Sequence, residues 1–131
     1  MQSDNLITLV TNDGHEITYL DYVLCARFQV IDELIHYMGN PKEIPVDLTF
    51  DVLKAVLLFT DTLETPKEDD EWKKLIKGAD YLMIQPVYLS FLMIAIKCYM
   101  IEKWPTFQNR VPMTLEDFLK LFEKNDTLPF H

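Results

Sequence analysis

The feature that most constrains this chain is a strongly apolar run from Val87 to Ile101, interrupted by Ser90 and Lys97. Such a surface can be covered by lipid, by the protein's own core or by another protein. At about 15 residues, the run is shorter than the roughly 20 apolar residues that cross a bilayer. We therefore expect no membrane span, and we expect a helix that protein covers on more than one side.

Length and composition predict a single globular protein that is rich in helix. The chain has 131 residues, of which 49% are hydrophobic and only three are glycine, so one core of ordinary size can be buried. The net charge of −9 and the pI near 4.6 argue against nucleic acid and anionic lipid surfaces as partners. Two distant cysteines and an N-terminus without a secretory signal pattern predict a cytoplasmic or nuclear protein.

The order of local patterns predicts an α+β fold and not a doubly wound sheet, because strands and helices do not alternate regularly. Alternating residues on both sides of Asn12-Asp13-Gly14 predict a β-hairpin over about 6–19. Pro45 predicts a short edge strand at 43–46. The helical patterns predict a helix at 22–27 capped by Asp21, one at 30–38, one after Thr49, one at 72–83, one opened by Pro86, and one of about ten residues after Thr114. The acidic segment 61–71 is predicted to be an exposed loop, and 104–112 to be a connection.

No pattern in the chain is typical of a catalytic, cofactor or metal site. His15, His36 and His131 occur singly, without the spacing of a metal site. There is no glycine-rich phosphate loop, and no serine lies in a nucleophile-elbow context. Cys98 is expected to be buried in the apolar helix and therefore inert. We expect a protein without enzymatic activity, catalytic residues, cofactor or metal, which acts by binding other proteins.

Several motifs follow one another in an order that resembles a known family. They are NDGHEI, EIPV, FDVLKAVLLF, EDDEW, GADYLMI and TLEDFLKLFEKND. Together they resemble the adaptor subunit of SCF ubiquitin ligases, the S-phase kinase-associated protein family, over roughly residues 5 to 128. The first motif is also similar to elongin C, a related adaptor. The closing FEKND favours the SCF branch.

The resemblance implies a BTB/POZ fold, with a small sheet, an N-terminal hairpin, a helical bundle and a C-terminal helical extension. It implies a BTB/POZ-like core at 1–104 and a receptor-binding extension at 105–131, which is shortened relative to the family. The segment that begins at Ala79 is similar to the family's Ala-Asn-Tyr-Leu segment, which contributes to the contact with the cullin. The implied cullin-facing residues are Pro45, Asp80 and Tyr81. Asp80 replaces the usual amide and adds a negative charge to that contact.

By the same resemblance, the chain bridges the N-terminal domain of a cullin and an F-box-type substrate receptor, as a non-enzymatic subunit of a cullin-RING E3 ubiquitin ligase. The implied F-box-facing residues are Cys98, Ile101, Trp104, Leu119 and Phe122. When the receptor is absent, a homodimer through the apolar face that carries these residues is a further possibility. The alternative is a BTB-fold protein that binds an F-box-like or other helical partner without engaging a cullin. The Asp80 exchange and a shortened approach to the Ala79 segment favour this alternative.

Overall fold

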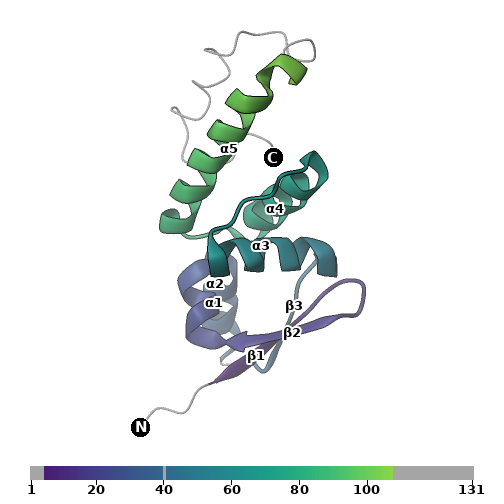
Figure 1. Ribbon diagram of the computed structural model, residues 1–131. Coiled ribbons are helices and arrows are strands. Elements are labelled where there is room, and N and C mark those ends of the chain that lie inside the picture. Colours follow the sequence, from purple (N-terminus) through teal and green to yellow (C-terminus); the bar gives the residue numbers. More distant parts are fainter. Residues whose placement is uncertain (1–4, 40, 108–131) are drawn as a thin grey trace. The chain divides into compact units, whose positions relative to one another are not determined.

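The structure is a computed structural model, which describes residues 5–39 and 41–107 (Figure 1). Contacts along the chain divide it into two compact units, Met1–Gln85 and Pro86–His131. The described residues form five helices and one three-stranded sheet. The predicted α+β class is therefore confirmed. The predicted division into a core at 1–104 and an extension at 105–131 stays a prediction.

The sheet is built around a hairpin near the N-terminus. Strands β1 (Leu6–Val10) and β2 (Glu16–Leu20) pair antiparallel, and β3 (Glu43–Pro45) pairs parallel with β1. The strand order is β2-β1-β3, so the central strand is β1. Gly14 lies in the turn with a φ of 86°, a conformation that glycine adopts without strain. The predicted hairpin and the predicted edge strand around Pro45 are both confirmed.

Two helices follow the hairpin directly. They are α1 (Asp21–Arg27) and α2 (Gln29–Met38), and they are separated by Phe28, which is fully buried. Asp21 was predicted to cap α1 from outside the helix, and this was wrong. It is the first helical residue, because the helix begins where β2 ends, and its carboxylate accepts a hydrogen bond from the Tyr22 amide at 2.6 Å.

Helix α3 (Phe50–Thr62) lies between the sheet and α4 (Figure 1). The predicted cap is confirmed, since the Val52 amide donates a hydrogen bond to the Thr49 hydroxyl at 3.4 Å. The helix is buried on more than one side, which suits an element placed between two layers. Its buried residues are Val52, Leu53, Val56, Leu57, Phe59 and Thr60.

Helix α4 (Asp69–Leu82) begins inside the segment predicted to be an exposed acidic loop. The prediction of a loop over 61–71 was therefore wrong at both ends, since α3 also continues to Thr62. The first turn of α4 holds Asp69, Asp70 and Glu71. Acidic side chains favour this position because the first backbone N–H groups of a helix have no internal acceptor. The expected apolar stripe is confirmed, with Trp72, Leu75, Ala79 and Leu82 all buried.

Helix α5 (Pro86–Phe107) belongs to the second unit and contains the apolar run. Pro86 opens it as predicted, and the Ser90 hydroxyl donates to the Pro86 carbonyl at 2.9 Å. The helix continues past Trp104 into the segment predicted to be a connection. A proline so close to the end removes one hydrogen bond from the last turn only. None of the helices in the described part of the chain is long and apolar enough to cross a membrane. The helix predicted after Thr114 lies outside the described residues.

Gly78 allows α3 and α4 to approach closely. A Cβ atom at this position would lie 3.1 Å from Val56 Cβ and 3.2 Å from the Val52 carbonyl oxygen. Glycine in the middle of a helix costs about 1 kcal/mol relative to alanine. Here that cost accompanies a contact in which one helix packs against the backbone of the other.

We expect Gly78→Leu to lower the free energy of unfolding by about 2 kcal/mol or more, because the side chain would push against both Val56 and the α3 backbone. Chemical denaturation monitored by circular dichroism measures the change. Lys77→Leu, at the exposed neighbouring position, is the control and should change the stability by no more than about 0.5 kcal/mol. Equal stabilities of the two variants would contradict the close contact.

Candidate functional site

A surface of the first unit is formed by the hairpin turn, the segment after β3 and the end of α4. We call it the turn face and define it by Asn12, Pro45, Asp47, Asp80 and Tyr81. The Asn12 side-chain amide donates to the Asp47 carboxylate at 3.0 Å, and the Asp47 amide donates to the Tyr81 hydroxyl at 3.0 Å. All five residues are exposed. Side chains from three distant parts of the sequence are thus joined by hydrogen bonds at one surface.

The end of α4 is fixed by the backbone that follows it. Met83 has a φ of 53°, in the left-handed region, and its amide donates to the Asp80 carbonyl at 3.3 Å. Ile84 then forms an isolated antiparallel bridge with Phe28, and the Gln85 amide donates to the Arg27 carbonyl at 2.7 Å. The residues that follow α4 are therefore held to Arg27 and Phe28, and this fixes the helix end that carries Asp80 and Tyr81.

The three predicted cullin-facing residues lie in two segments that one hydrogen bond joins. Pro45 lies two residues before Asp47, whose amide contacts Tyr81, and Asp80 is the neighbour of Tyr81 in α4. Sequence reasoning missed Asn12 and Asp47 as members of this surface. The Asn12-Asp13-Gly14 turn was visible in the sequence, but its hydrogen bond crosses 35 positions, and no local pattern indicates such a partner.

Asp13 joins the hairpin turn to the start of α3. Its carboxylate accepts from the Thr11 hydroxyl at 2.5 Å and from the Phe50 amide at 3.1 Å. These hydrogen bonds, that from Thr11 first, hold the pKa of Asp13 below its ordinary value of 3.8. The ring of His15 stacks on Phe50 at 4.5 Å between centroids. Both contacts fix the turn against the helix.

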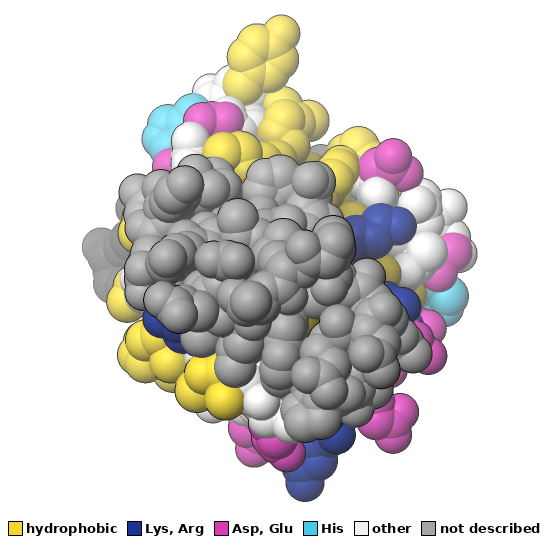
Figure 2. Space-filling model, turned by 90° about the horizontal axis from the view of Figure 1, so that it is seen from above, with side chains coloured by type: hydrophobic (Ala, Val, Ile, Leu, Met, Phe, Trp, Pro, Cys, Tyr) yellow, Lys and Arg dark blue, Asp and Glu magenta, His cyan; other side chains and the backbone are white. Residues whose placement is uncertain are grey.

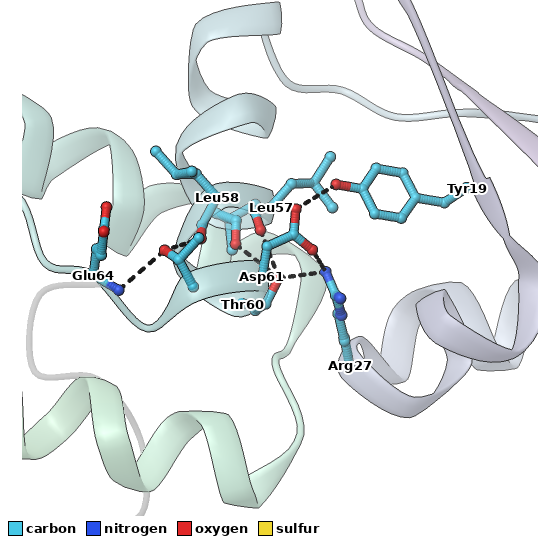
Figure 3. Close-up of polar contacts among 9 residues, drawn as sticks. Tyr19, Arg27, Leu57, Leu58, Thr60, Asp61 and Glu64 are labelled. Atoms are coloured by element: carbon cyan, nitrogen blue, oxygen red, sulfur yellow. Dashed lines mark hydrogen bonds and ion pairs between the residues drawn. The ribbon is translucent and has the colours of Figure 1, made fainter.

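A second polar cluster lies at the other end of α3 (Figure 3). Asp61 accepts a hydrogen bond from the Tyr19 hydroxyl at 2.8 Å and from the Arg27 guanidinium at 2.5 Å. The same guanidinium nitrogen donates to the Thr60 hydroxyl at 3.0 Å. Burial, together with the bond to Asp61, raises the pKa of Tyr19 above its ordinary value of 10.0. The cluster ties β2 and α1 to the last turns of α3.

An open groove of about 510 Å³ lies beside this cluster, between β2 and the helices α3 and α4. Apolar side chains from β2 and α3 lie next to charged side chains of both signs. Lys74 forms an ion pair with Glu71 at 3.2 Å. The Lys54 ammonium lies over the ring of Phe50, 5.0 Å from its centroid. The lining residues are Ile17, Tyr19, Asp51, Lys54, Ala55, Leu57, Leu58, Asp61, Glu71 and Lys74.

The predicted F-box-facing residues fall partly on α5 and partly outside the described residues. Cys98 and Ile101 lie one helical turn apart, and both are exposed. The expectation that Cys98 is buried was therefore wrong, because an all-apolar sequence does not indicate which side of a helix is covered. The backbone of Trp104 belongs to α5, while its side chain, Leu119 and Phe122 lie outside the described part.

The remaining candidates for chemistry are isolated side chains. Burial, and then the neighbouring carboxylate of Asp32, raise the pKa of Cys25 to about 11, so its thiol is protonated at neutral pH. His15 and His36 are exposed, and each lies near a single carboxylate, Asp13 and Asp32 respectively. In the part of the chain that the structure describes, no three His, Cys, Asp or Glu side chains are grouped so that they could hold a metal ion.

Comparison with protein-family models finds no family that matches this chain. Comparison with curated proteins finds no matching relative. The likeness to the SCF adaptor family therefore rests on the sequence motifs alone.

Asp13 predicts how stability responds to acid. Because its pKa is lowered by folding, its contribution is present above pH 3.8 and is lost as the pH falls through the lower pKa of the folded state. We expect Asp13→Asn to have a lower free energy of unfolding than the wild type at pH 7. Below about pH 4, the free energy of unfolding should fall less steeply in the variant than in the wild type, because the variant has no carboxylate to protonate at this position. Urea denaturation from about pH 2.5 to about pH 7, a range that includes the ordinary aspartate pKa of 3.8, measures the difference. Glu43→Gln on β3 is the control, and an identical acid response of Asp13→Asn and wild type would refute the assignment.

Proposed function

We propose that this chain is a non-enzymatic adaptor with a BTB/POZ fold, which bridges the N-terminal domain of a cullin and an F-box-type receptor in a cullin-RING ubiquitin ligase. It acts in the cytoplasm or the nucleus. The proposal starts from the resemblance of the sequence motifs to the S-phase kinase-associated protein family. The α+β architecture, with its hairpin and parallel edge strand, is consistent with it.

The observation that carries the proposal is the hydrogen bond from the Asp47 amide to the Tyr81 hydroxyl, 3.0 Å long. The resemblance assigns the region around Pro45 and the segment around Tyr81 to the same cullin-facing surface, although they are more than 30 positions apart. This bond joins the two regions, and both are exposed. A chance likeness of short motifs gives no reason for the two segments to meet.

The receptor side of the proposal rests on α5. Cys98 and Ile101 present apolar surface to solvent, Ile101 with 48% of its surface exposed, and such surface is suited to an amphipathic helix of a receptor. Figure 2 shows hydrophobic side chains open at the surface of the described part, among acidic ones. The adaptor would act by proximity, since tethering a receptor to the ligase raises the local concentration of substrate.

A second candidate function is favoured by Asp80. The carboxylate is exposed in the last turn of α4, at the position where the family carries an amide. Residues 1–85 also hold sixteen acidic against seven basic side chains, a net charge of −9. An acidic surface weakens binding to a partner whose contacting patch is also negative, or whose contacting patch fits a neutral group. In this case the chain binds a helical partner without engaging a cullin.

The two candidates are separated by a pull-down with the N-terminal domain of a cullin, with wild-type chain and Asp80→Asn. The adaptor proposal expects binding of the wild type, because Asp80 is tolerated at the contact. Binding gained only by Asp80→Asn supports the second candidate. Asp32→Asn, which removes a carboxylate from α2, is the control. If neither wild type nor Asp80→Asn binds, the bridging role is wrong.

On the receptor side, Trp104→Ala or Phe122→Ala is expected to weaken binding of an F-box domain by about 2 kcal/mol or more, as for buried aromatic anchors. Isothermal titration calorimetry measures the affinity, and circular dichroism confirms that the variants are folded. Tyr37→Ala is the control, since Tyr37 lies on α2 with 89% of its surface exposed. Unchanged affinity in both folded variants would place the receptor elsewhere.

A further inference from the structure

The exposed apolar side chains of α5 follow a regular spacing. From one to the next they are four, three, four and three positions apart, which is the spacing of the a and d positions of a heptad repeat. Three of them expose 50% or more of their surface, with Ile94 at 61%. We call this set the heptad seam, and its residues are Val87, Phe91, Ile94, Cys98 and Ile101.

The seam is one side of a helix whose other side is covered. Leu92 and Ile96 are buried, and in the same heptad assignment they take the b and f positions, away from a and d. An ordinary amphipathic helix exposes polar residues on the side that does not face the core. Here the exposed side is apolar for two heptads, so α5 has a second apolar surface that the described structure leaves open.

We propose that a second copy of this chain covers the heptad seam, with the two α5 helices parallel and in register. The charges beside the seam identify the occupant. Lys97 takes a g position and Glu102 the e position five residues later, and in a parallel two-stranded coiled coil these two positions meet across the interface. The dimer axis therefore produces two equivalent pairs of Lys97 with Glu102 of the partner.

An antiparallel pair or a different covering segment does not pair Lys97 with Glu102. In an antiparallel pair, g positions face g positions and e positions face e positions, so Lys97 and Glu102 would not meet each other. The overall charge does not oppose the parallel pair, because residues 86–131 hold five acidic and five basic side chains. The negative charge of the chain lies in residues 1–85. A covering segment from the chain's own C-terminal part or from another protein would require its own matching charges.

The parallel arrangement also places Cys98 at an a position, where each residue faces its own copy across the axis. The Cα atoms of such a pair lie about 6 Å apart, within the range that allows a covalent link. Two heptads are a short seam, and we expect it to bury less than the roughly 800 Å² per partner of a standard interface. We therefore expect a dimer that dissociates at about micromolar concentrations and does not depend on the proposed adaptor function.

The test uses the full chain in analytical ultracentrifugation from about 1 to 200 μM, a range set by the expected affinity. The wild type should pass from monomer to dimer. Ile94→Asp should remain monomeric across the range with an unchanged helix signal. Tyr37→Asp, which replaces an even more exposed aromatic residue on α2, should dimerise like the wild type. A wild type that is monomeric throughout the range overturns the proposal.

Charge reversal tests the orientation. Lys97→Glu and Glu102→Lys should each raise the dissociation constant roughly tenfold, and the double reversal should restore it, because two surface ion pairs are lost and then rebuilt. In a Cys25→Ser background, a short bis-maleimide should link Cys98 to Cys98 of the second copy, and Ile94→Asp should abolish the link. Failure of the double reversal to restore the affinity, or equal cross-linking of Ile94→Asp, would overturn the parallel arrangement.

Discussion

Helix α3 is the element on which the rest of the first unit depends. It lies between the sheet and α4, and its contact with α4 is close because Gly78 has no side chain. The carboxylate of Asp13 holds its first turn to the hairpin, and Asp61 holds its last turns to Tyr19 and Arg27. Packing supplies most of the stability of such a helix. The polar contacts at its two ends fix where it lies.

The local elements could be predicted because each is encoded by neighbouring residues. Alternation around Gly14 predicted the hairpin, Thr49 the start of α3, and Pro86 the start of α5. The acidic segment was misread because the composition that suits an exposed loop also suits the first turn of a helix. Asp69 and its neighbours lie in that turn, and only the apolar stripe from Trp72 onward was a clear helical signal.

The candidate site was harder to predict because its contacts join distant segments. Pro45 and Tyr81 were named only through the resemblance, and nothing local indicates the bond from Asp47 to Tyr81. Arg27 and Asp61 lie 34 positions apart, so their pairing also required the fold. On α5 the difficulty was different. When every side of a helix is apolar, periodicity does not tell which side is open, and the exposure of Cys98 had to be observed.

The anchoring of the hairpin turn by Asp13 has a consequence for handling the protein in acid. The chain carries no net charge near pH 4.6, where repulsion between molecules vanishes and precipitation is favoured. The pKa of Asp13 lies below its ordinary value of 3.8, so its carboxylate is ionised at that pH. The hydrogen bonds of this carboxylate with Thr11 and Phe50 are therefore retained at the pH at which the protein is least soluble.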